Sequence, residues 1–373
     1  MKDKALEVCS YYMGTSLYKN LFDQFTDKKV DHDILYFCSR PTVLKKDIPE
    51  NFIVSQPYEP IDRLFFFRKH RKVYEDIQEK VDFDKYYLTH AHSLVSNGYI
   101  SLKIKENYGI PYIVAVRNTD LFVFLKHYPF IKNTARKILD EAENVIFLSP
   151  AYRDITINKY VKKENRKKIE EKSFILPNGI DKYFLDNRKV KIRESDKKIN
   201  LVYVGRVDDL NKNVLTSVKA CKILIEQGYD IKFTVVGRLE NSLFKKVLLK
   251  NKFVHHVPST DKEGVRKVLD SNDIFLMPSK RETFGLVYVE AMSQGLPVIY
   301  TKGQGFDGHF KEGYVGYHVV YNNANDISER VKDILNNYNE MSKNASEEAM
   351  KFNWKEISNK YIDIYNNIRN EKI

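Results

Sequence analysis

The sequence predicts an α/β protein built on two parallel β-sheets. Short apolar runs typical of buried strands alternate with stretches of helical pattern along the whole chain. This alternation indicates right-handed βαβ units, in which each helix connects two parallel strands. A chain of 373 residues is long enough for two domains of about 150 residues each, and a hydrophobic content of 43% can fill two cores.

The N-terminal half contains the first series of strands, which we expect at residues 5–9, 34–38, 86–88, 112–116 and 145–148. The segment that opens the chain lacks the apolar region of a signal peptide. No apolar run approaches the roughly 20 residues of a membrane span. We therefore expect a cytoplasmic protein.

The C-terminal half repeats the arrangement, with strands at residues 199–204, 231–236, 253–257, 273–277 and 297–300 and helices such as 214–227 and 262–270. The sequence thus predicts two Rossmann-like domains that face a central cleft. They comprise residues 1–180, completed by a final helix within residues 354–373, and residues 181–353, with a linker at residues 176–196. Ligands of open α/β sheets bind outside the carboxyl ends of the strands, where this chain carries its polar motifs.

The charge of the chain favours acidic partners. The formal net charge is +12, which suits a membrane surface, a phosphorylated substrate or a nucleic acid. The three cysteines are scattered and odd in number, which argues against a disulfide framework. Neither half has a Gly-x-Gly-x-x-Gly sequence after its first strand, so a dinucleotide-dependent dehydrogenase is disfavoured.

The most informative segment, residues 278–292, places two carboxylates around a glycine turn between a strand and an amphipathic helix. Such a turn leaves backbone N–H groups at the helix N-terminus, where a diphosphate can bind. Glu282 lies in the turn, and Glu290 lies roughly 8 Å further along at ~1.5 Å per helical residue. The two carboxylates can therefore meet hydroxyl groups on either side of a phosphate, which fits a nucleotide sugar.

This segment resembles the E-x7-E motif of the retaining GT-B glycosyltransferases, specifically glycosyltransferase family 4. Arg206 and Lys212, which follow the strand ending at Val204, are similar to the Arg and Lys with which that family grips the donor diphosphate. Other segments resemble the family from about Tyr87 onwards: His90-Ala91-His92 with Gly98, Pro177-Asn178-Gly179-Ile180-Asp181 and Phe352-Asn353-Trp354. The resemblance implies a GT-B fold.

The resemblance also implies a donor site in the C-terminal domain. Arg206 and Lys212 would neutralise the charge that builds on the departing diphosphate, in place of a metal. Glu290 would accept hydrogen bonds from ribose hydroxyls, and Glu282 from hydroxyls of the transferred sugar. The expected site is completed by Gly205, by His255 at the base pocket, by Thr283, Phe284, Gly285 and Leu286 at the phosphates, and by Gly14, for which an ordinary turn is the alternative.

The N-terminal domain departs from the family at residue 117, where many members have histidine. Arg117 could hold a phosphate as a fixed cation. Asp120 could meet an acceptor hydroxyl or cap a helix. We expect His90 and His92 to point to opposite faces, because they stand two residues apart on or just after a strand. On this prediction His92 is a candidate catalytic residue and His90 is structural.

A second departure follows the strand at residues 297–300. The usual tandem glycines are replaced by Gly303-Gln304-Gly305-Phe306-Asp307-Gly308, a variant that indicates no particular substrate.

An aromatic run lies beside a basic cluster at residues 63–73. Phe65, Phe66 and Phe67 and the neighbouring Arg and Lys side chains could seat on an anionic membrane. Alternatively, the rings could be core residues of a helix with a basic outer face.

No metal cofactor is expected. The pair His255-His256 lacks further ligands at metal-binding spacing. Asp31-His32-Asp33 and Asp82-Phe83-Asp84 mimic the Asp-x-Asp metal motif of GT-A enzymes, but the rest of that fold is missing around them.

Taken with the resemblance, these features predict a retaining, metal-independent glycosyltransferase. It would move a hexosyl or N-acetylhexosaminyl unit from a nucleoside diphosphate sugar to the hydroxyl of a glycan or lipid-linked acceptor. We expect the donor to be a UDP-sugar. Capsule, exopolysaccharide or cell-wall glycan assembly in a bacterium is the expected setting. The alternatives are another GT-B enzyme, such as a nucleotide-sugar epimerase or a sugar-phosphate synthase, and a basic nucleic-acid-binding protein, for which no recognition motif is present.

Overall fold

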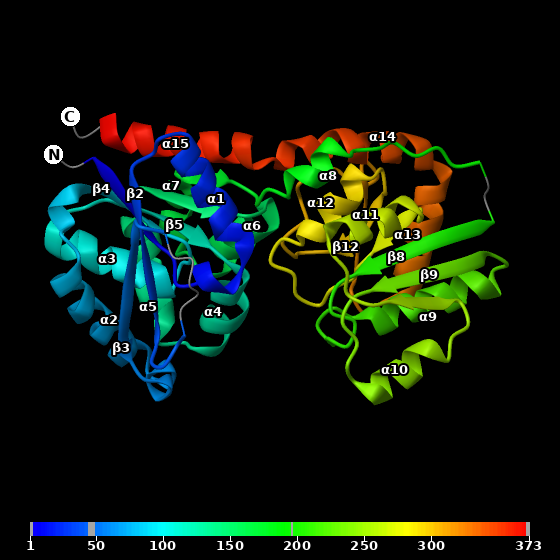
Figure 1. Cartoon of the computed structure of the whole chain (residues 1–373), viewed down its shortest axis with the longest axis horizontal. Coiled ribbons are helices and arrows are strands. Elements are labelled where there is room, and N and C mark those ends of the chain that lie inside the picture. The colour runs from blue at the N-terminus through cyan, green and yellow to red at the C-terminus, as the bar shows by residue number, and fades with distance from the viewer. Residues whose placement is uncertain (1–2, 44–48, 195–196, 371–373) are drawn as a thin grey trace. The chain divides into compact units, whose positions relative to one another are not determined.

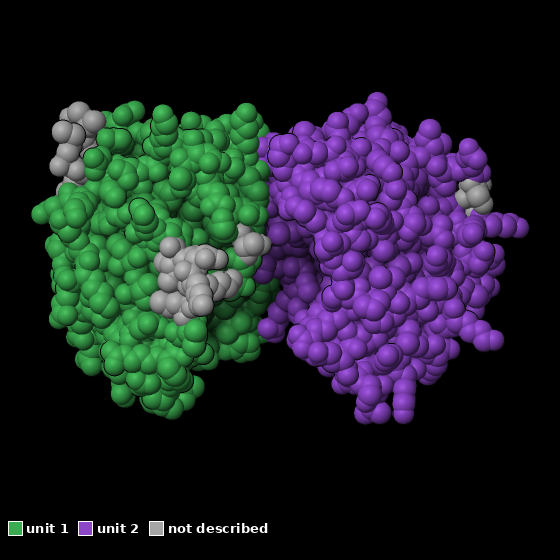
Figure 2. All heavy atoms as spheres, viewed as in Figure 1, with its two compact units in different colours: residues 1–148, 152–177, 354–373 green, residues 149–151, 178–353 purple. Residues whose placement is uncertain are grey.

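The computed structural model describes residues 3–43, 49–194 and 197–370 (Figure 1). The chain forms two compact units, which are coloured separately in Figure 2. Unit 1 comprises Met1–Leu148, Tyr152–Pro177 and Trp354–Ile373, and unit 2 comprises Ser149–Ala151 and Asn178–Asn353. The last two residues of the expected linker, 195 and 196, lie outside the described residues.

Unit 1 is built on a seven-stranded parallel sheet with the order β3-β2-β1-β4-β5-β6-β7. Its strands are β1 (Lys4–Val8), β2 (His32–Ser39), β3 (Phe52–Tyr58), β4 (Tyr86–Ala91), β5 (Tyr112–Val116), β6 (Asn144–Phe147) and β7 (Ser173–Ile175). In the register of the central pair, Val8 of β1 stands opposite Ala91 of β4. The carboxyl ends of these two strands therefore meet at one edge.

Helices cover both faces of this sheet: α1 (Ser16–Asp27), α2 (Phe66–Lys80), α3 (Ser96–Tyr108), α4 (Leu125–His127), α5 (Ile131–Glu141), α6 (Pro150–Lys159), α7 (Arg166–Glu171) and α15 (Trp354–Asn370). Successive residues of β1 serve opposite faces. Ala5 packs with residues of α1 and α15, whereas Leu6 packs with residues of α2 and α3. The last helix of the chain, red in Figure 1, thus belongs to the core of unit 1.

Unit 2 is built on a six-stranded parallel sheet with the order β10-β9-β8-β11-β12-β13. Its strands are β8 (Lys198–Val204), β9 (Asp230–Val236), β10 (Val254–Val257), β11 (Ile274–Leu276), β12 (Val298–Thr301) and β13 (Gly316–Val319). Its helices are α8 (Lys182–Asp186), α9 (Val214–Glu226), α10 (Ser242–Leu249), α11 (Lys262–Asp270), α12 (Leu286–Ser293), α13 (Ala324–Asn336) and α14 (Tyr338–Glu348).

Two parallel α/β sheets confirm the predicted fold class. The sequence-based prediction did not include β3, β7 and β13, each of which lies at the edge of its sheet. Edge strands are covered less completely than central ones, so these segments lack a continuous apolar run; Phe174 of β7, for example, is exposed. Pro57 within β3 is likewise a residue that edge strands tolerate.

Within the described residues, no helix is long and apolar enough to cross a membrane.

Candidate active site

A glycine turn opens helix α12 immediately after β11. Gly285 has a φ of +81°, and a Cβ built on it would lie 2.4 Å from Cε2 of Tyr288. Only glycine fits this position without displacing the Tyr288 ring, which is held by a hydrogen bond of 2.6 Å from its hydroxyl to the Met277 carbonyl. The first backbone N–H groups of α12 therefore form a fixed helix N-terminus suited to an anion.

Glu282 and Lys212 meet beside this turn. The Lys212 Nζ lies 2.5 Å from Oε2 of Glu282, and the backbone N–H of Thr283 donates to Oε1 at 3.1 Å. Both side chains are largely buried, at 24% and 11% exposure for Lys212 and Glu282. Two residues 70 positions apart in the sequence, each predicted to touch the donor, thus lie in direct contact.

Lys212 is positioned by the two asparagines that flank it. The Asn211 amide donates to the Arg281 carbonyl at 2.8 Å, and the Asn213 amide donates to the Pro278 carbonyl at 3.0 Å. Asn213 adopts a left-handed conformation, which asparagine tolerates better than most residues. These hydrogen bonds fix the segment after β8 against the segment after β11, and the sequence motifs gave no indication of them.

Glu290 lies in α12 with its carboxylate largely removed from water. Burial, assisted by the nearby charge of Asp181, raises the pKa of Glu290 to about 7. Among the described residues none donates a hydrogen bond to this carboxylate. A buried acceptor of this kind gains from hydroxyl groups that a ligand brings.

Arg206 follows β8, and its side chain is 59% exposed. Its Nε donates to Oδ1 of Asp208 at 3.1 Å, and Oδ2 of Asp208 accepts the backbone N–H groups of Glu240 and Asn241. Asp208 therefore anchors the arginine to the loop after β9, a role that the sequence analysis missed.

Two glycines come close together at the ends of β8 and β9. The backbone of Gly205 donates to the Val236 carbonyl at 2.9 Å, and a Cβ on Gly237 would lie 1.9 Å from the Gly205 carbonyl oxygen. Gly237 was not among the predicted site residues, although Gly205 was. His255 of β10 is exposed, and its Nδ1 lies 3.2 Å from the Phe253 carbonyl oxygen.

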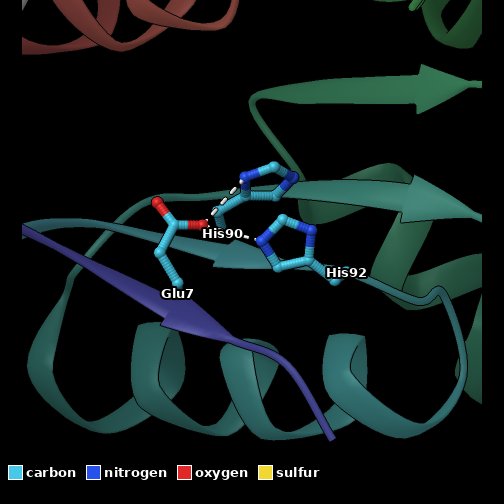
Figure 3. A group of neighbouring side chains, drawn as sticks. All are labelled: Glu7, His90 and His92. Atoms are coloured by element: carbon cyan, nitrogen blue, oxygen red, sulfur yellow. Dashed lines mark hydrogen bonds and ion pairs between the residues drawn. The ribbon is translucent and has the colours of Figure 1, made fainter. Parts of the chain in front are cut away.

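In unit 1, His90 and His92 converge on Glu7 of β1 (Figure 3). The Nε2 of His92 lies 2.7 Å from Oε2 of Glu7, and the Nδ1 of His90 lies 3.2 Å from the same oxygen. The prediction that the two histidines point to opposite faces is wrong, because their ring centroids are 3.9 Å apart. Successive strand residues point to opposite faces, so residues two positions apart share a face, and His92 keeps this direction although β4 ends at Ala91.

Tyr365 of α15 completes this buried network. Its hydroxyl donates to Oε1 of Glu7 at 2.7 Å and lies 2.6 Å from Nδ1 of His90. Burial alone would raise the pKa of Glu7, but His90 and His92 outweigh it and hold that pKa well below its usual range. Burial lowers the pKa of His92 to about 3, and His90 adds to this effect. The network therefore holds an ionised carboxylate beside a neutral His92.

Two groups of side chains in the described residues have the donor types of a metal site. They are Glu7, His90 and His92, and Asp307, Glu312 and His318, with ligand atoms in each group within 4.8 Å of one another. In both groups the carboxylates already accept hydrogen bonds from neighbouring protein groups, so these contacts account for the clusters without an ion.

Arg117 and Asp120 lie next to this network. The Arg117 Nε donates to the His92 carbonyl at 3.1 Å, and its guanidinium lies 5.8 Å from the centre of the Tyr18 ring. Asp120 accepts the backbone N–H groups of Leu94, Val95 and Arg117 at 3.0, 2.9 and 2.8 Å. Burial raises the pKa of Asp120 to about 6 even with these three donors. Asp120 thus holds the backbone that leads into α3 and does not cap its own helix.

Gly14 lies at the end of a short 3-10 helix that follows β1. It is exposed, and a Cβ built on it would meet no atom within 4 Å. The local structure therefore does not require glycine at this position.

Comparison with known proteins finds a family match over most of unit 2. Residues 186–352 match the family Glycosyl transferases group 1. The uncharacterized glycosyltransferase MJ1178 of Methanocaldococcus jannaschii is 25% identical over 280 residues, which span 72% of this chain and 71% of that protein. The capsular polysaccharide biosynthesis glycosyltransferase CapM of Staphylococcus aureus is 29% identical over 209 residues, which span about half of each chain at 52% and 53%.

The fold also matches a solved structure over nearly its whole length. The crystal structure of HepE from Anabaena in complex with UDP has a TM-score of 0.70 at 15% identity and covers 98% of this chain and 100% of that one. The family match, the glycosyltransferase relatives and the shared architecture together show a glycosyltransferase with the GT-B fold, in which residues 186–352 match the family Glycosyl transferases group 1.

Proposed function

We propose that this protein is a retaining glycosyltransferase that moves a hexosyl or N-acetylhexosaminyl unit from a UDP-sugar to an acceptor hydroxyl without a metal ion. The observation that carries the proposal is the contact between Lys212 and Glu282 beside the N-terminus of α12. A cation, a carboxylate and a helix N-terminus meet there at the carboxyl ends of β8 and β11. These groups suit the diphosphate and the sugar of one ligand, and the related HepE fold is known in complex with UDP.

In this proposal Lys212 exchanges partners when the donor binds. Its ammonium group leaves Glu282 for the diphosphate, and the released carboxylate accepts hydrogen bonds from the transferred sugar. Arg206 swings from Asp208 to the same diphosphate, and Glu290 accepts hydrogen bonds from the ribose. The two cations and the N-terminus of α12 then stabilise the negative charge of the leaving group, the role that a metal serves elsewhere.

The proposed transfer keeps the anomeric configuration. The bond from the anomeric carbon to the phosphate oxygen breaks, and the acceptor oxygen bonds to that carbon on the same face. The departing phosphate takes the acceptor proton. Retention is checked by NMR of the product anomer, and an inverted product would contradict it. Conversion of the donor into its epimer with no acceptor present would instead indicate an epimerase.

We propose capsule, exopolysaccharide or cell-wall glycan assembly as the setting, on the support of CapM, a capsular polysaccharide glycosyltransferase. The acceptor in that setting is a glycan or a lipid-linked glycan, and unit 1 would bind it. Arg117 is the candidate group of unit 1 for that role, and His92, which is fully buried against Glu7, would act by holding Arg117 through its carbonyl.

An anionic membrane surface is the proposed partner of unit 1. Six exposed apolar side chains, called here the apolar surface, come from two segments: Ile61, Leu64, Phe65, Phe67, Tyr128 and Phe130. The rings of Phe67 and Phe130 lie 6.1 Å apart, so the two segments form one surface. Next to Phe67 is a cavity of about 440 Å³ that is also lined by Arg68, Arg71 and Lys103, which matches the charge of anionic headgroups.

Phe66 does not belong to the apolar surface, contrary to the sequence-based prediction. It is 8% exposed, and its ring centre lies 4.1 Å from that of His70. Phe66 is therefore a core residue of unit 1, whereas Phe65 and Phe67 remain exposed.

Thermal unfolding with nucleotides tests the donor site. UDP at one hundred times its Kd should stabilise the wild type by about 2.7 kcal/mol in the presence of EDTA. Lys212→Ala and Glu290→Ala should lose this stabilisation, whereas Lys219→Ala, an exposed lysine of α9, should keep it. Stabilisation by GDP or ADP in place of UDP would change the donor class, and no stabilisation by any nucleotide would contradict the donor site.

A further inference from the structure

The loop that follows β12 forms hydrogen bonds with both the N–H and the carbonyl group of Glu282. The side-chain Oε1 of Gln304 accepts a hydrogen bond from the Glu282 N–H at 3.1 Å. The next residue, Gly305, donates its N–H to the Glu282 carbonyl at 3.0 Å. Both hydrogen-bonding groups of this residue's main chain are thus held by two adjacent residues of one loop.

This approach depends on glycine at position 305. A Cβ on Gly305 would lie 1.8 Å from the Thr283 carbonyl oxygen and 2.9 Å from the Glu282 carbonyl oxygen. Any side chain at position 305 would therefore force the loop away from the turn that precedes α12. The sequence Gly303-Gln304-Gly305, which departs from the tandem glycines of the family, accordingly combines a close backbone contact with a side-chain acceptor.

The loop has firm supports of its own. Asp307 accepts the Gly303 N–H at 2.7 Å through one carboxylate oxygen, and the other lies 2.9 Å from Nδ1 of His318 on β13. Phe306 is 1% exposed, and its ring centre lies 5.0 Å from that of Tyr288 on α12. A loop anchored at both the sheet edge and the helix can act as a rigid support for what it holds.

The side chain of Glu282, by contrast, has an exchangeable partner. Its Oε2 accepts a hydrogen bond from Lys212, whose ammonium group would bind the donor diphosphate instead when the donor is present. Once Lys212 turns to the phosphate, the orientation of the carboxylate depends on the main chain around it, both where the side chain begins and at the Thr283 N–H, which donates to Oε1 at 3.1 Å. Two hydrogen bonds from the loop fix that main chain.

We propose that Gln304 is a positioning residue that sets the Glu282 carboxylate against the hydroxyl groups of the transferred sugar. This inference rests on the proposed function, in which Glu282 contacts the sugar. Gln304 then governs how the sugar is held and leaves the affinity for UDP unchanged, because the proposed partner of Glu282 is the transferred sugar, which UDP lacks.

Substitutions of Gln304 separate the two effects. Gln304→Met keeps the length of the side chain and removes the acceptor, whereas Gln304→Glu restores an acceptor oxygen at the same place. Gln227→Met, at the exposed end of α9, makes the same change away from the site. Three readouts are compared: the stabilisation by UDP, the release of UDP from UDP-glucose, UDP-galactose and UDP-N-acetylglucosamine, and the hydrogen exchange of the Glu282 amide without nucleotide.

The expected result is specific to the sugar. Gln304→Met should bind UDP like the wild type, lower kcat/KM for the UDP-sugar about tenfold, and expose the Glu282 amide to faster exchange. Gln304→Glu should recover most of the turnover, and Gln227→Met should match the wild type throughout.

Three outcomes would overturn the inference. Turnover of Gln304→Met equal to the wild type would show that the contact does not position Glu282. Equal losses of UDP stabilisation and turnover would show that Gln304 merely supports the fold of the site. If the wild type neither bound UDP nor released it from a UDP-sugar, the proposed function would fail and this role would fail with it, while amide exchange would still report whether the loop grips Glu282.

Discussion

Glu290 shows at the scale of one residue how a buried carboxylate reduces the stability of the folded chain. Its buried carboxylate has a pKa of about 7, whereas a carboxyl group in the unfolded chain titrates near 4.5. An acid whose pKa rises on folding favours the folded state only while it is protonated. The free energy of unfolding therefore falls as the pH rises from about 4.5 through about 7.

We predict that Glu290→Gln stabilises the protein above neutral pH. At about pH 8 the gain should be on the order of 2 to 3 kcal/mol, since the neutral amide avoids the burial of a charge. Near pH 4.5 the variant and the wild type should unfold at similar temperatures. The measurement is the unfolding midpoint across this pH range, with the exposed Glu226→Gln as the control. A gain that did not depend on pH would argue against the raised pKa.

The sequence predicted some residues of the proposed donor site, and a physical reason explains why it did not indicate the others. Glu282, Lys212 and Gly285 stand out because each lies at a fixed spacing from a strand end within a motif that the resemblance assigns to the donor. Asp208 and Gln304 act on other residues of the site through contacts made between separate loops. Such contacts leave no local pattern, so only the folded chain shows them.

Helix α2 makes the same point at the scale of an element. Three consecutive phenylalanines suggest one aromatic group in the sequence, but consecutive positions on a helix point about 100° apart. Phe66 accordingly faces the core and Phe67 faces outward beside Phe130, which comes from a different segment. A related reason explains why the sequence did not predict the edge strands β3, β7 and β13. An edge strand has a neighbouring strand on one side only and is less completely buried, so its sequence lacks the continuous apolar run of a central strand.

We predict that the apolar surface of unit 1 binds anionic vesicles. Phe67→Ser combined with Phe130→Ser should weaken binding to phosphatidylglycerol vesicles about tenfold, because each ring loses apolar contact with the bilayer. Leu243→Ser, which removes an exposed apolar side chain from α10 of unit 2, should leave binding unchanged. Cosedimentation measures the effect. Binding that stayed the same in the double variant, or binding to a protein partner without any to vesicles, would refute the membrane role.

At the scale of the whole molecule, the first strand and the last helix depend on each other. Glu7 and Tyr365 are 358 residues apart, and their side chains meet at 2.7 Å in the core of unit 1. The predicted series of strands and helices indicated the two sheets, but nothing in it indicated that a histidine pair and a tyrosine of the final helix share one carboxylate.

We predict that Tyr365→Phe destabilises unit 1. The change removes a hydrogen bond to a buried carboxylate, which should cost about 1 to 3 kcal/mol. Tyr314→Phe, at a half-exposed tyrosine of unit 2, should have little effect. Thermal unfolding measures both, and hydrogen exchange should place the loss of protection in β1 and α15. If Tyr365→Phe unfolded at the same midpoint temperature as the wild type, the hydrogen bond of Tyr365 would contribute no stability.

The contribution of α15 to the core of unit 1 also sets an order of events on the ribosome. β1 is synthesised first, yet Glu7 meets Tyr365 only after all of unit 2 has been translated. Unit 2 consists mainly of one continuous stretch and can complete its sheet while the nascent chain is still growing. Unit 1 must keep an unfinished core until α15 has been synthesised, so a chain that stalls or is released before that point would expose this core to chaperones and proteases.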